Sequence, residues 1–366
     1  MIEKTAHNYI NSSLNSPAFV FDIDILKEHL NMVKNALWPF KLCYAMKANP
    51  LLVGIVEPFV ERIEVCSEGE FEICKAYKIP AKKIFYTGVL KSLDGVKSAL
   101  EYGVRLFNIE SQSQLEMIRN LDKSVGIFLR LSSDNHFGID ENLIFEILKD
   151  DSLDILGLHY FAGTFRDKKR HFDIARLSKF LSKYKFKELE YGAGLGVAYF
   201  DGEKDSVNLE TLKNDLESFK IPVCVELGRY LVAKCGFYAS KVGDVKTSQN
   251  VNYAILDGGM NHLNYYGQMM GMKNPIILNS SDKNLIKAYT LCGPICSTND
   301  VITRSAELNE LKIGDILCFL NTGAYSSTEA SYLFLSRDLP SIYIYENGKF
   351  ELIREPKNTY NLNMKG

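Results

Sequence analysis

Eight short apolar runs, rich in β-branched and aromatic residues, recur through the chain and are separated by helix-like segments. The runs lie at residues 40–46, 62–66, 84–87, 105–109, 126–132, 154–160, 188–192 and 222–226. The helix-like segments include residues 69–76, 90–101, 111–120, 141–148, 168–184 and 209–219. Strands that alternate with helices form parallel sheets, because each helix returns the chain to the same end of the sheet. An α/β chain with eight such repeats is expected to close into a (β/α)8 barrel.

The pattern changes after residue 235. Strand-like runs follow at residues 236–246, 251–257, 285–292, 313–320, 341–345 and 350–353, without helices of comparable length between them. Such a series predicts an antiparallel β domain of the Greek-key or sandwich type. A further run at 17–21 is grouped with it, whereas residues 1–16 show no strong period. The predicted domains are a barrel over 22–235 and a β domain built from 1–21 and 236–366.

The length and net charge of the chain indicate which kinds of partner it can bind. With 366 residues the chain has room for a large barrel and a second domain. A net charge of -2 gives no general attraction to nucleic acid or to an anionic membrane. No apolar run approaches the ~20 residues that span a bilayer, and the N-terminus lacks a signal-peptide pattern. We therefore expect a cytoplasmic protein with no nucleic-acid or membrane partner.

The eight cysteines lie mostly inside apolar runs. They form no Cys-x-x-Cys pair and no spacing typical of a metal site, so no metal is predicted. We interpret them as reduced core residues, except for Cys296, which could take part in a reaction.

Lys47 ends the first of the eight runs, in the stretch Tyr-Ala-Met-Lys-Ala-Asn-Pro. A buried ammonium is costly unless it is paired or loses its proton. An unprotonated lysine is a nucleophile that forms a Schiff base with an aldehyde cofactor. The alternative is a lysine whose stem lies along the strand end while its ammonium reaches water.

Polar and glycine-rich segments also follow other runs, where a barrel places its active site. They are Glu64, Arg130, the segment from His159 to Thr164, the segment from Gly192 to Gly196, and the segment from Glu226 to Arg229. In a closed barrel the eighth strand neighbours the first, so Glu226 and Lys47 can face one cofactor. A carboxylate there would keep a pyridinium nitrogen protonated, and the alternative for Glu226 is a salt-bridged core residue.

The glycine run does not fit the dinucleotide fingerprint Gly-x-Gly-x-x-Gly. A fingerprint that starts at Gly192 needs its last glycine at position 197, which is a valine. The run fits a phosphate cradle of backbone N–H groups after the seventh strand. A tight structural turn is the alternative. Arg229 would be a natural phosphate ligand beside such a cradle.

Taken together, several motifs resemble the fold-type III pyridoxal-phosphate decarboxylases, which include diaminopimelate, ornithine and arginine decarboxylases. The motifs are YAMKANP, VCSEGE, GAGLG, ELGRYLVA, CGPICSTND and GAY, and the resemblance runs from about residue 17 to about residue 355. It implies a barrel that binds pyridoxal 5'-phosphate, a β domain, and a homodimer with shared active sites.

The resemblance also implies residue roles. Cofactor contacts would come from Lys47, Glu64, Arg130, His159, Phe161, Gly194, Gly196, Glu226, Gly228, Arg229 and Tyr325. Lys47 would be the Schiff-base lysine, and Glu226 would face the pyridine nitrogen. Cys296, supplied by the partner subunit, would help to protonate the carbanion after carbon dioxide leaves. Substrate contacts would come from Asn261, Ser297 and Asp300.

The chain departs from the family pattern at three places. Phe161 stands where a cofactor-stacking histidine is usual, Ser297 replaces an acidic residue, and no arginine follows the Gly-Met-Asn motif, where Asn264 occurs. These differences resemble a side branch of secondary metabolism, which includes the butirosin-pathway glutamyl-carrier-protein decarboxylase, the decarboxylases of peptide-nucleotide antibiotic maturation, and an exosortase-associated group. They predict an unusual or carrier-linked amino-acid substrate.

Other functions stay open. A free amino acid such as diaminopimelate, lysine, ornithine or arginine is the first alternative substrate. A racemase would need a second base, commonly a tyrosine, where Cys296 stands. A catalytically inactive cofactor-binding regulatory protein comes from a different class. A hydrolase with paired carboxylates Glu64 and Glu226 leaves Lys47 without a role.

Overall fold

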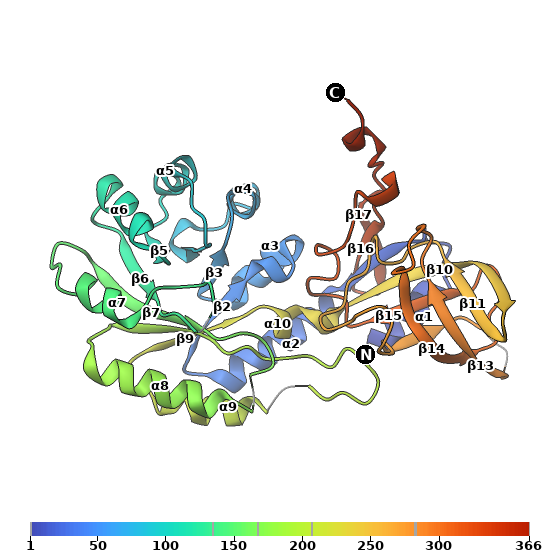
Figure 1. Cartoon of the computed structure of the whole chain (residues 1–366), viewed down its shortest axis with the longest axis horizontal. Helices are drawn as coiled ribbons and strands as arrows, with labels where there is room; N and C mark the ends of the chain where they lie inside the picture. The colour runs from blue at the N-terminus through green and yellow to red at the C-terminus, as the bar shows by residue number, and fades with distance from the viewer. Residues whose placement is uncertain (1, 134, 167, 206–207, 282–283, 366) are drawn as a thin grey trace. The chain divides into compact units, whose positions relative to one another are not determined.

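The computed structural model describes the whole chain except residues 1, 134, 167, 206–207, 282–283 and 366 (Figure 1). The chain forms two compact units. The barrel unit comprises residues 29–196 and 206–231, and the β unit comprises 1–28, 197–205 and 232–366. No helix in the described ranges combines the length and apolar character that crossing a bilayer requires.

Eight parallel strands close the barrel, which confirms the predicted fold class. They are β2 (Lys41–Ala45), β3 (Arg62–Val65), β4 (Ile84–Tyr86), β5 (Leu106–Ile109), β6 (Gly126–Arg130), β7 (Ile155–Phe161), β8 (Glu188–Gly192) and β9 (Val223–Leu227). Each coincides with one of the apolar runs. Closure comes from β2, whose Cys43 lies beside Arg62 of β3 and beside Glu226 of β9.

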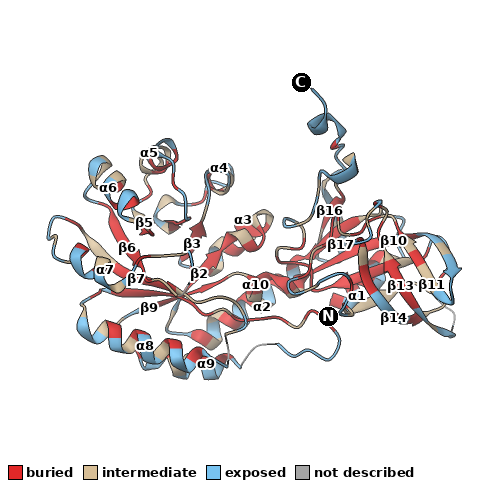
Figure 2. Cartoon of the chain, viewed as in Figure 1, coloured by how far each residue is buried: buried red, intermediate tan, exposed pale blue. Residues whose placement is uncertain are grey.

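Helices follow the barrel strands, and the outer faces of the longer helices are exposed while the strands are buried (Figure 2). They are α2 (Ile23–Leu37), α3 (Val53–Val56), α4 (Glu68–Ala76), α5 (Leu93–Tyr102), α6 (Gln112–Leu121), α7 (Glu141–Ile147), α8 (Arg170–Lys183), α9 (Leu209–Glu217) and the short α10 (Arg229–Val232). Ser67, Ser92 and Ser111 cap α4, α5 and α6 by accepting a backbone N–H. Such caps stabilise a helix by roughly 1 kcal/mol and fix where the loop ends.

The β unit contains a sheet in the order β14-β13-β11-β10-β1-β16-β17, with β15 beside β10 and β12. Its strands are β1 (Ala18–Asp22), β10 (Gly236–Ser248), β11 (Val251–Leu256), β12 (Ile277–Asn279), β13 (Ile286–Cys292), β14 (Val301–Asn309), β15 (Ile316–Leu320), β16 (Ser341–Glu346) and β17 (Lys349–Arg354). Most pairs are antiparallel, but β1 runs parallel to β16 and β11 runs parallel to β13.

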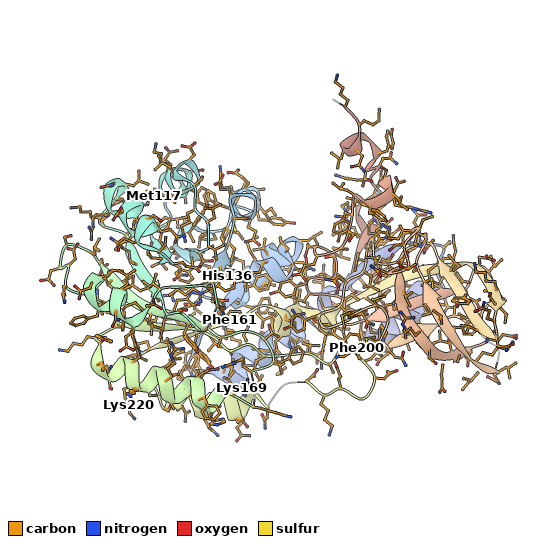
Figure 3. The ribbon with its side chains drawn as sticks, in the orientation of Figure 1. Met117, His136, Phe161, Lys169, Phe200 and Lys220 are labelled. Atoms are coloured by element: carbon orange, nitrogen blue, oxygen red, sulfur yellow. The ribbon has the colours of Figure 1, made fainter. Side chains whose placement is uncertain are left out.

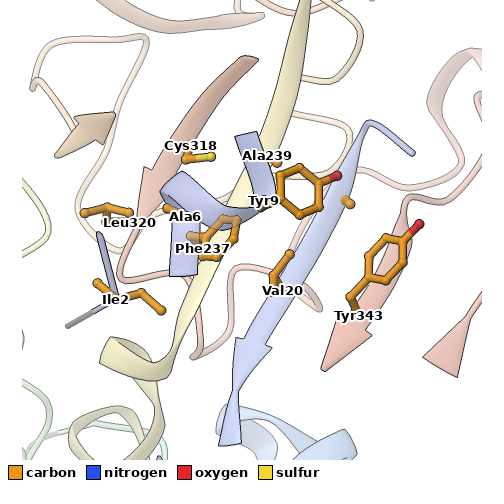
Figure 4. Close-up of a cluster of buried hydrophobic side chains, with 10 residues drawn as sticks. Ile2, Ala6, Tyr9, Val20, Phe237, Ala239, Cys318, Leu320 and Tyr343 are labelled. Carbon is orange, nitrogen blue, oxygen red and sulfur yellow. The ribbon is translucent and has the colours of Figure 1, made fainter. Parts of the chain in front are cut away.

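The N-terminal helix α1 (Ile2–Ile10) completes the core of the β unit. Its Tyr9 ring meets Phe237 edge-on at 5.6 Å and Tyr343 at 6.2 Å (Figure 4). Ile2 and Ala6 are buried with Tyr9 on the same face of the helix. The sequence showed no strong period here, because only three apolar positions one turn apart carry the contact.

Candidate active site

Lys47 lies between two buried carboxylates. Strand β2 ends at Ala45, and the short turn Met46–Ala48 carries the lysine beyond it. The Lys47 Nζ atom donates to Glu64 Oε2 at 2.5 Å and lies 3.9 Å from Glu226 Oε1. The Lys47 side chain is 39% exposed, whereas those of Glu64 and Glu226 are 3% and 6% exposed. The amine therefore contacts a buried carboxylate, while part of the lysine side chain remains accessible.

His159 lies next to Glu226 inside the barrel. Its Nε2 atom is 3.2 Å from Glu226 Oε2, but the two atoms are not aligned as a hydrogen bond. Burial lowers the pKa of His159 to about 3, so the imidazole is neutral at physiological pH. Within the described residues, Glu226 Oε2 is thus buried without a hydrogen-bond partner.

Arg130 ends β6 and pairs with Glu110, which follows β5. Its Nη1 atom donates to Glu110 Oε1 at 2.9 Å, and its guanidinium lies 4.4 Å from the centre of the Phe137 ring. Lys91 is buried nearby and donates to the Gly88 carbonyl and to the Gln114 side chain. Burial lowers the pKa of Lys91 to about 8. The sequence reasoning missed Glu110 and Lys91.

The glycine segment after β8 packs against the loop after β7. Gly194 has a φ of +61°, and a Cβ there would lie 2.1 Å from the Gly163 carbonyl oxygen. A Cβ on Gly196 would lie 2.1 Å from the Phe165 ring, and the Phe165 N–H donates to the Gly194 carbonyl at 2.8 Å. Both glycines are therefore required by this close loop packing, in line with the structural-turn alternative. Gly194 is partly exposed and Gly196 is buried, and a turn built from small residues can also present backbone N–H groups to an anion.

Phe161 is the last residue of β7 and is labelled in Figure 3. Its ring covers Gly192, where a Cβ would lie 2.5 Å from a ring carbon. At the end of β9, Gly228 precedes Arg229, the buried first residue of α10. The predicted site residues of the barrel unit thus lie near or just after the carboxyl ends of β2, β3, β6, β7, β8 and β9.

The remaining predicted residues belong to the β unit. Asp300 is buried, and its two oxygens accept the N–H groups of Met260 and Ile295, both at 2.9 Å. Burial raises the pKa of Asp300. The carboxylate holds together two turns, one of which presents the exposed Cys296 and the partly exposed Ser297.

Asn261 and Tyr325 occupy turns of the same unit. Asn261 is buried, and its Oδ1 atom accepts the Gly259 N–H at 3.1 Å. Tyr325 has a φ of +62° and begins a turn in which its carbonyl accepts two backbone N–H groups. The structure thus brings Asn261, Cys296, Ser297 and Asp300 together through the turns that Asp300 fixes.

A second set of charged residues fills the barrel interior one layer below Lys47. Arg62 donates to Glu190 Oε2 at 2.6 Å and to Glu188 Oε2 at 2.5 Å, and Lys41 reaches Glu188 Oε1 at 2.9 Å. Burial raises the pKa of Glu190 to about 7 despite the nearby Arg62. This charged layer was also missed, although the alternation Glu-Leu-Glu in β8 is a visible signal that both glutamates share a face.

Comparison with known proteins assigns the family. A family model described as "Pyridoxal-dependent decarboxylase, C-terminal sheet domain" matches residues 18–323. A diaminopimelate decarboxylase of Aquifex aeolicus is 26% identical, over 98% of this chain and 93% of that protein. The L-glutamyl-[BtrI acyl-carrier protein] decarboxylase of Niallia circulans is 23% identical, over 93% of this chain and 91% of that protein.

The fold is also found among solved structures. The diaminopimelate decarboxylase of Helicobacter pylori, complexed with L-lysine, superposes with a TM-score of 0.85. It is 23% identical, and the match covers 99% of this chain and 98% of that one.

Proposed function

This chain belongs to the family of pyridoxal-dependent decarboxylases, and we propose that it removes the α-carboxyl group of a free diamino acid, with diaminopimelate as the first candidate. The chain is a decarboxylase of amino acids that uses pyridoxal 5'-phosphate. The observation that carries the catalytic part is the amine of Lys47 between Glu64 and Glu226 at the carboxyl ends of the barrel strands. The comparisons support the choice of substrate.

The donor set of the barrel unit fits the cofactor. Glu226 Oε2 is buried and lacks a hydrogen-bond partner among the described residues, as suits a carboxylate that accepts from a ring N–H. Lys47 supplies the amine that an aldehyde requires. Arg229, with the backbone of Gly194 and Gly196, supplies a cation and N–H groups for a phosphate.

When bound, pyridoxal 5'-phosphate supplies an aldehyde that captures amines and a ring that accepts the electrons left by carbon dioxide. Lys47 would hold the cofactor through its amine, and Glu64, which accepts from that amine, is placed to take the proton that the ammonium must lose. Glu226 would hold the ring nitrogen in its protonated form through the buried Oε2 atom. Neutral His159 and Phe161 exclude water from the buried side of the site, and Arg130 fixes Glu110 beside it.

The β unit supplies the final proton. Decarboxylation consumes one proton, because a hydrogen replaces the departing carboxyl group. We propose that the Cys296 thiol of a partner subunit delivers it in a homodimer, while Ser297 and Asn261 contact the substrate and Asp300 holds their turns. The exposed position of Cys296 supports this role. Tyr325 is also proposed as a cofactor contact.

The substrate assignment rests on relatives that carry out this reaction. Diaminopimelate decarboxylases of Aquifex aeolicus, Bacteroides thetaiotaomicron and Haemophilus influenzae are 26% to 28% identical to this chain. They support a free amino acid more strongly than the carrier-linked substrate favoured by the sequence departures.

A carrier-linked substrate is the second candidate, because Ser297 and Asn264 are neutral where a distal charged group of a diamino acid would need partners. The Niallia circulans relative, named for a glutamyl group on an acyl-carrier protein, supports it. A pathway of secondary metabolism, such as antibiotic biosynthesis, would then be the context.

The deciding experiment measures carbon dioxide release from carboxyl-labelled free diaminopimelate, lysine, ornithine and arginine, and from a carrier-bound glutamyl group. Diaminopimelate is expected to react, and Lys47→Ala is the inactive control. Release from the carrier-bound group alone would contradict the first candidate and support the second. No release from any compound, with the cofactor still bound through Lys47, would favour the non-catalytic alternative.

A further inference from the structure

Glu64 is 2% exposed, and each of its two oxygens has its own donors. Oε2 accepts from Lys47, as described above. Oε1 accepts from the Thr87 hydroxyl at 2.9 Å and from the Cys66 thiol at 3.2 Å. We propose that Cys66 and Thr87 are positioning residues, which hold Glu64 in the orientation that presents Oε2 to Lys47.

The backbone fixes both donors. Cys66 is the first residue after β3, and its N–H donates to Glu70 Oε2 at 2.7 Å at the start of α4. Thr87 is the first residue after β4, and its N–H donates to the Val65 carbonyl at 2.7 Å. The Thr87 hydroxyl also lies 3.2 Å from that carbonyl, but the carboxylate is closer and charged, so it is the stronger acceptor.

Cys66 acts here as a donor and not as a nucleophile. Its Sγ atom lies 3.6 Å from Lys47 Nζ and 3.1 Å from the Thr87 hydroxyl. Burial and the charge of Glu64 raise the pKa of the thiol far above its ordinary range. A thiol that keeps its proton can donate to Oε1, whereas a thiolate beside a buried carboxylate would be repelled.

The two donors decide which oxygen remains for the lysine. A buried carboxylate oxygen without a donor is costly, so Glu64 is most stable with Oε1 toward Cys66 and Thr87. Oε2 is then left for the ammonium of Lys47. Without the donors, the carboxylate is free to rotate away from Lys47, whose ammonium lies 3.9 Å from the second carboxylate, Glu226.

The test measures the proton affinity of Lys47 itself. In the full-length chain freed of cofactor, acetic anhydride labels unprotonated lysines, and the Lys47 peptide is quantified by mass spectrometry across a pH series. Cys66→Ala combined with Thr87→Val should weaken the ion pair and lower the pKa of the ammonium. Because a shift of one pKa unit is a tenfold change, labelling near neutral pH should rise about threefold to tenfold. Cys66→Ser and Thr87→Ser keep a donor and should follow the wild-type curve.

The same double change is then made in a Glu64→Gln chain. If both residues act through Glu64, it should cause no further shift there, because coupled residues are not additive. An unchanged curve in the first background, or a shift of equal size in both, would overturn the proposal. If circular dichroism shows that the double variant does not fold, the two single variants are compared in the same two backgrounds.

This inference rests on the proposed role of Lys47, but the labelling needs no substrate. A failed substrate screen would therefore leave it standing. A wild-type curve for the double variant would in turn leave the substrate assignment untouched.

Discussion

Replacing Arg62 by methionine should lower the free energy of unfolding by about 3–5 kcal/mol at pH 7, the range expected for a buried charge that loses its partner. Arg62 is 7% exposed and donates to Glu190 at 2.6 Å and to Glu188 at 2.5 Å. Methionine fills a similar space but pairs with neither carboxylate. Glu188 keeps Lys41 at 2.9 Å, whereas Glu190 is wholly buried and loses its charged partner.

The pH dependence identifies the residue responsible. The pKa of Glu190 is raised to about 7 with Arg62 in place, and it should rise further without the guanidinium. Above pH 7 the folded variant then retains a proton that both the wild-type protein and the unfolded chain have lost. Stability falls with pH when the folded state binds more protons, so the deficit should grow by up to about 1.4 kcal/mol per pH unit above pH 7. Below pH 7 it should be constant.

Urea titrations followed by far-ultraviolet circular dichroism, at pH 6, 7 and 8, measure this deficit in the full-length chain. Lys75→Met is the matched control, because Lys75 pairs with Glu72 on the exposed surface of α4 and should contribute under about 1 kcal/mol. Adding Glu190→Gln to Arg62→Met should recover part of the loss and remove its increase above pH 7. A deficit below about 1 kcal/mol, or one that neither varies with pH nor responds to Glu190→Gln, would refute the reasoning.

Further changes test the site and the β unit. Lys47→Ala should lose the visible band that borohydride fixes to the chain; a normal spectrum would remove the proposed role of this lysine. Cys296→Ala should slow decarboxylation or increase abortive transamination. An unchanged rate with the same product ratio would show that the thiol has no role in the reaction. Gly194→Ala should weaken cofactor binding at least tenfold, since its φ is +61° and a Cβ would meet the Gly163 carbonyl; equilibrium dialysis decides. Burial lowers the pKa of His262 to about 4, so the unfolded chain, with its histidine near 6.5, binds more protons between these values. Stability should fall by up to about 1.4 kcal/mol per pH unit as the pH drops from 6.5 to 4, and His262→Gln should abolish that share of the slope in urea titrations.

The barrel could be predicted because strand and helix alternate with different periods. Each apolar run is a strand buried on both faces, which leaves a continuous apolar signal. Closure of the barrel also predicts that Lys47 and Glu226 can face one another, since the first and last strands of a closed barrel are neighbours. The β unit was less predictable. Strand β14 was missed because irregular pairing with β13, near Tyr289 and Leu291, breaks the alternation that identifies a half-buried strand.

The site could be predicted only in part, because some of its contacts form between residues of different strands. Cys66 and Thr87 each follow a different strand, and nothing in either segment indicates that both side chains meet one oxygen of Glu64. Their convergence depends on the register of β3 against β4, which pairs Glu64 with Phe85. A register shift of one residue would turn a side chain to the other face of the sheet. Such contacts are therefore properties of the closed barrel and not of any single motif.

The same strand, β3, contributes to one inert ion pair and to one reactive ion pair. Arg62 and Glu64 are two residues apart and face the barrel interior in successive layers. In the lower layer the cation is an arginine, which does not lose its proton in proteins and whose side chain is 9% exposed. In the upper layer the cation is Lys47, which can lose its proton and whose side chain is 39% exposed. Buried carboxylates are common to both layers, so the choice between lysine and arginine, together with access from solvent, determines where chemistry can occur.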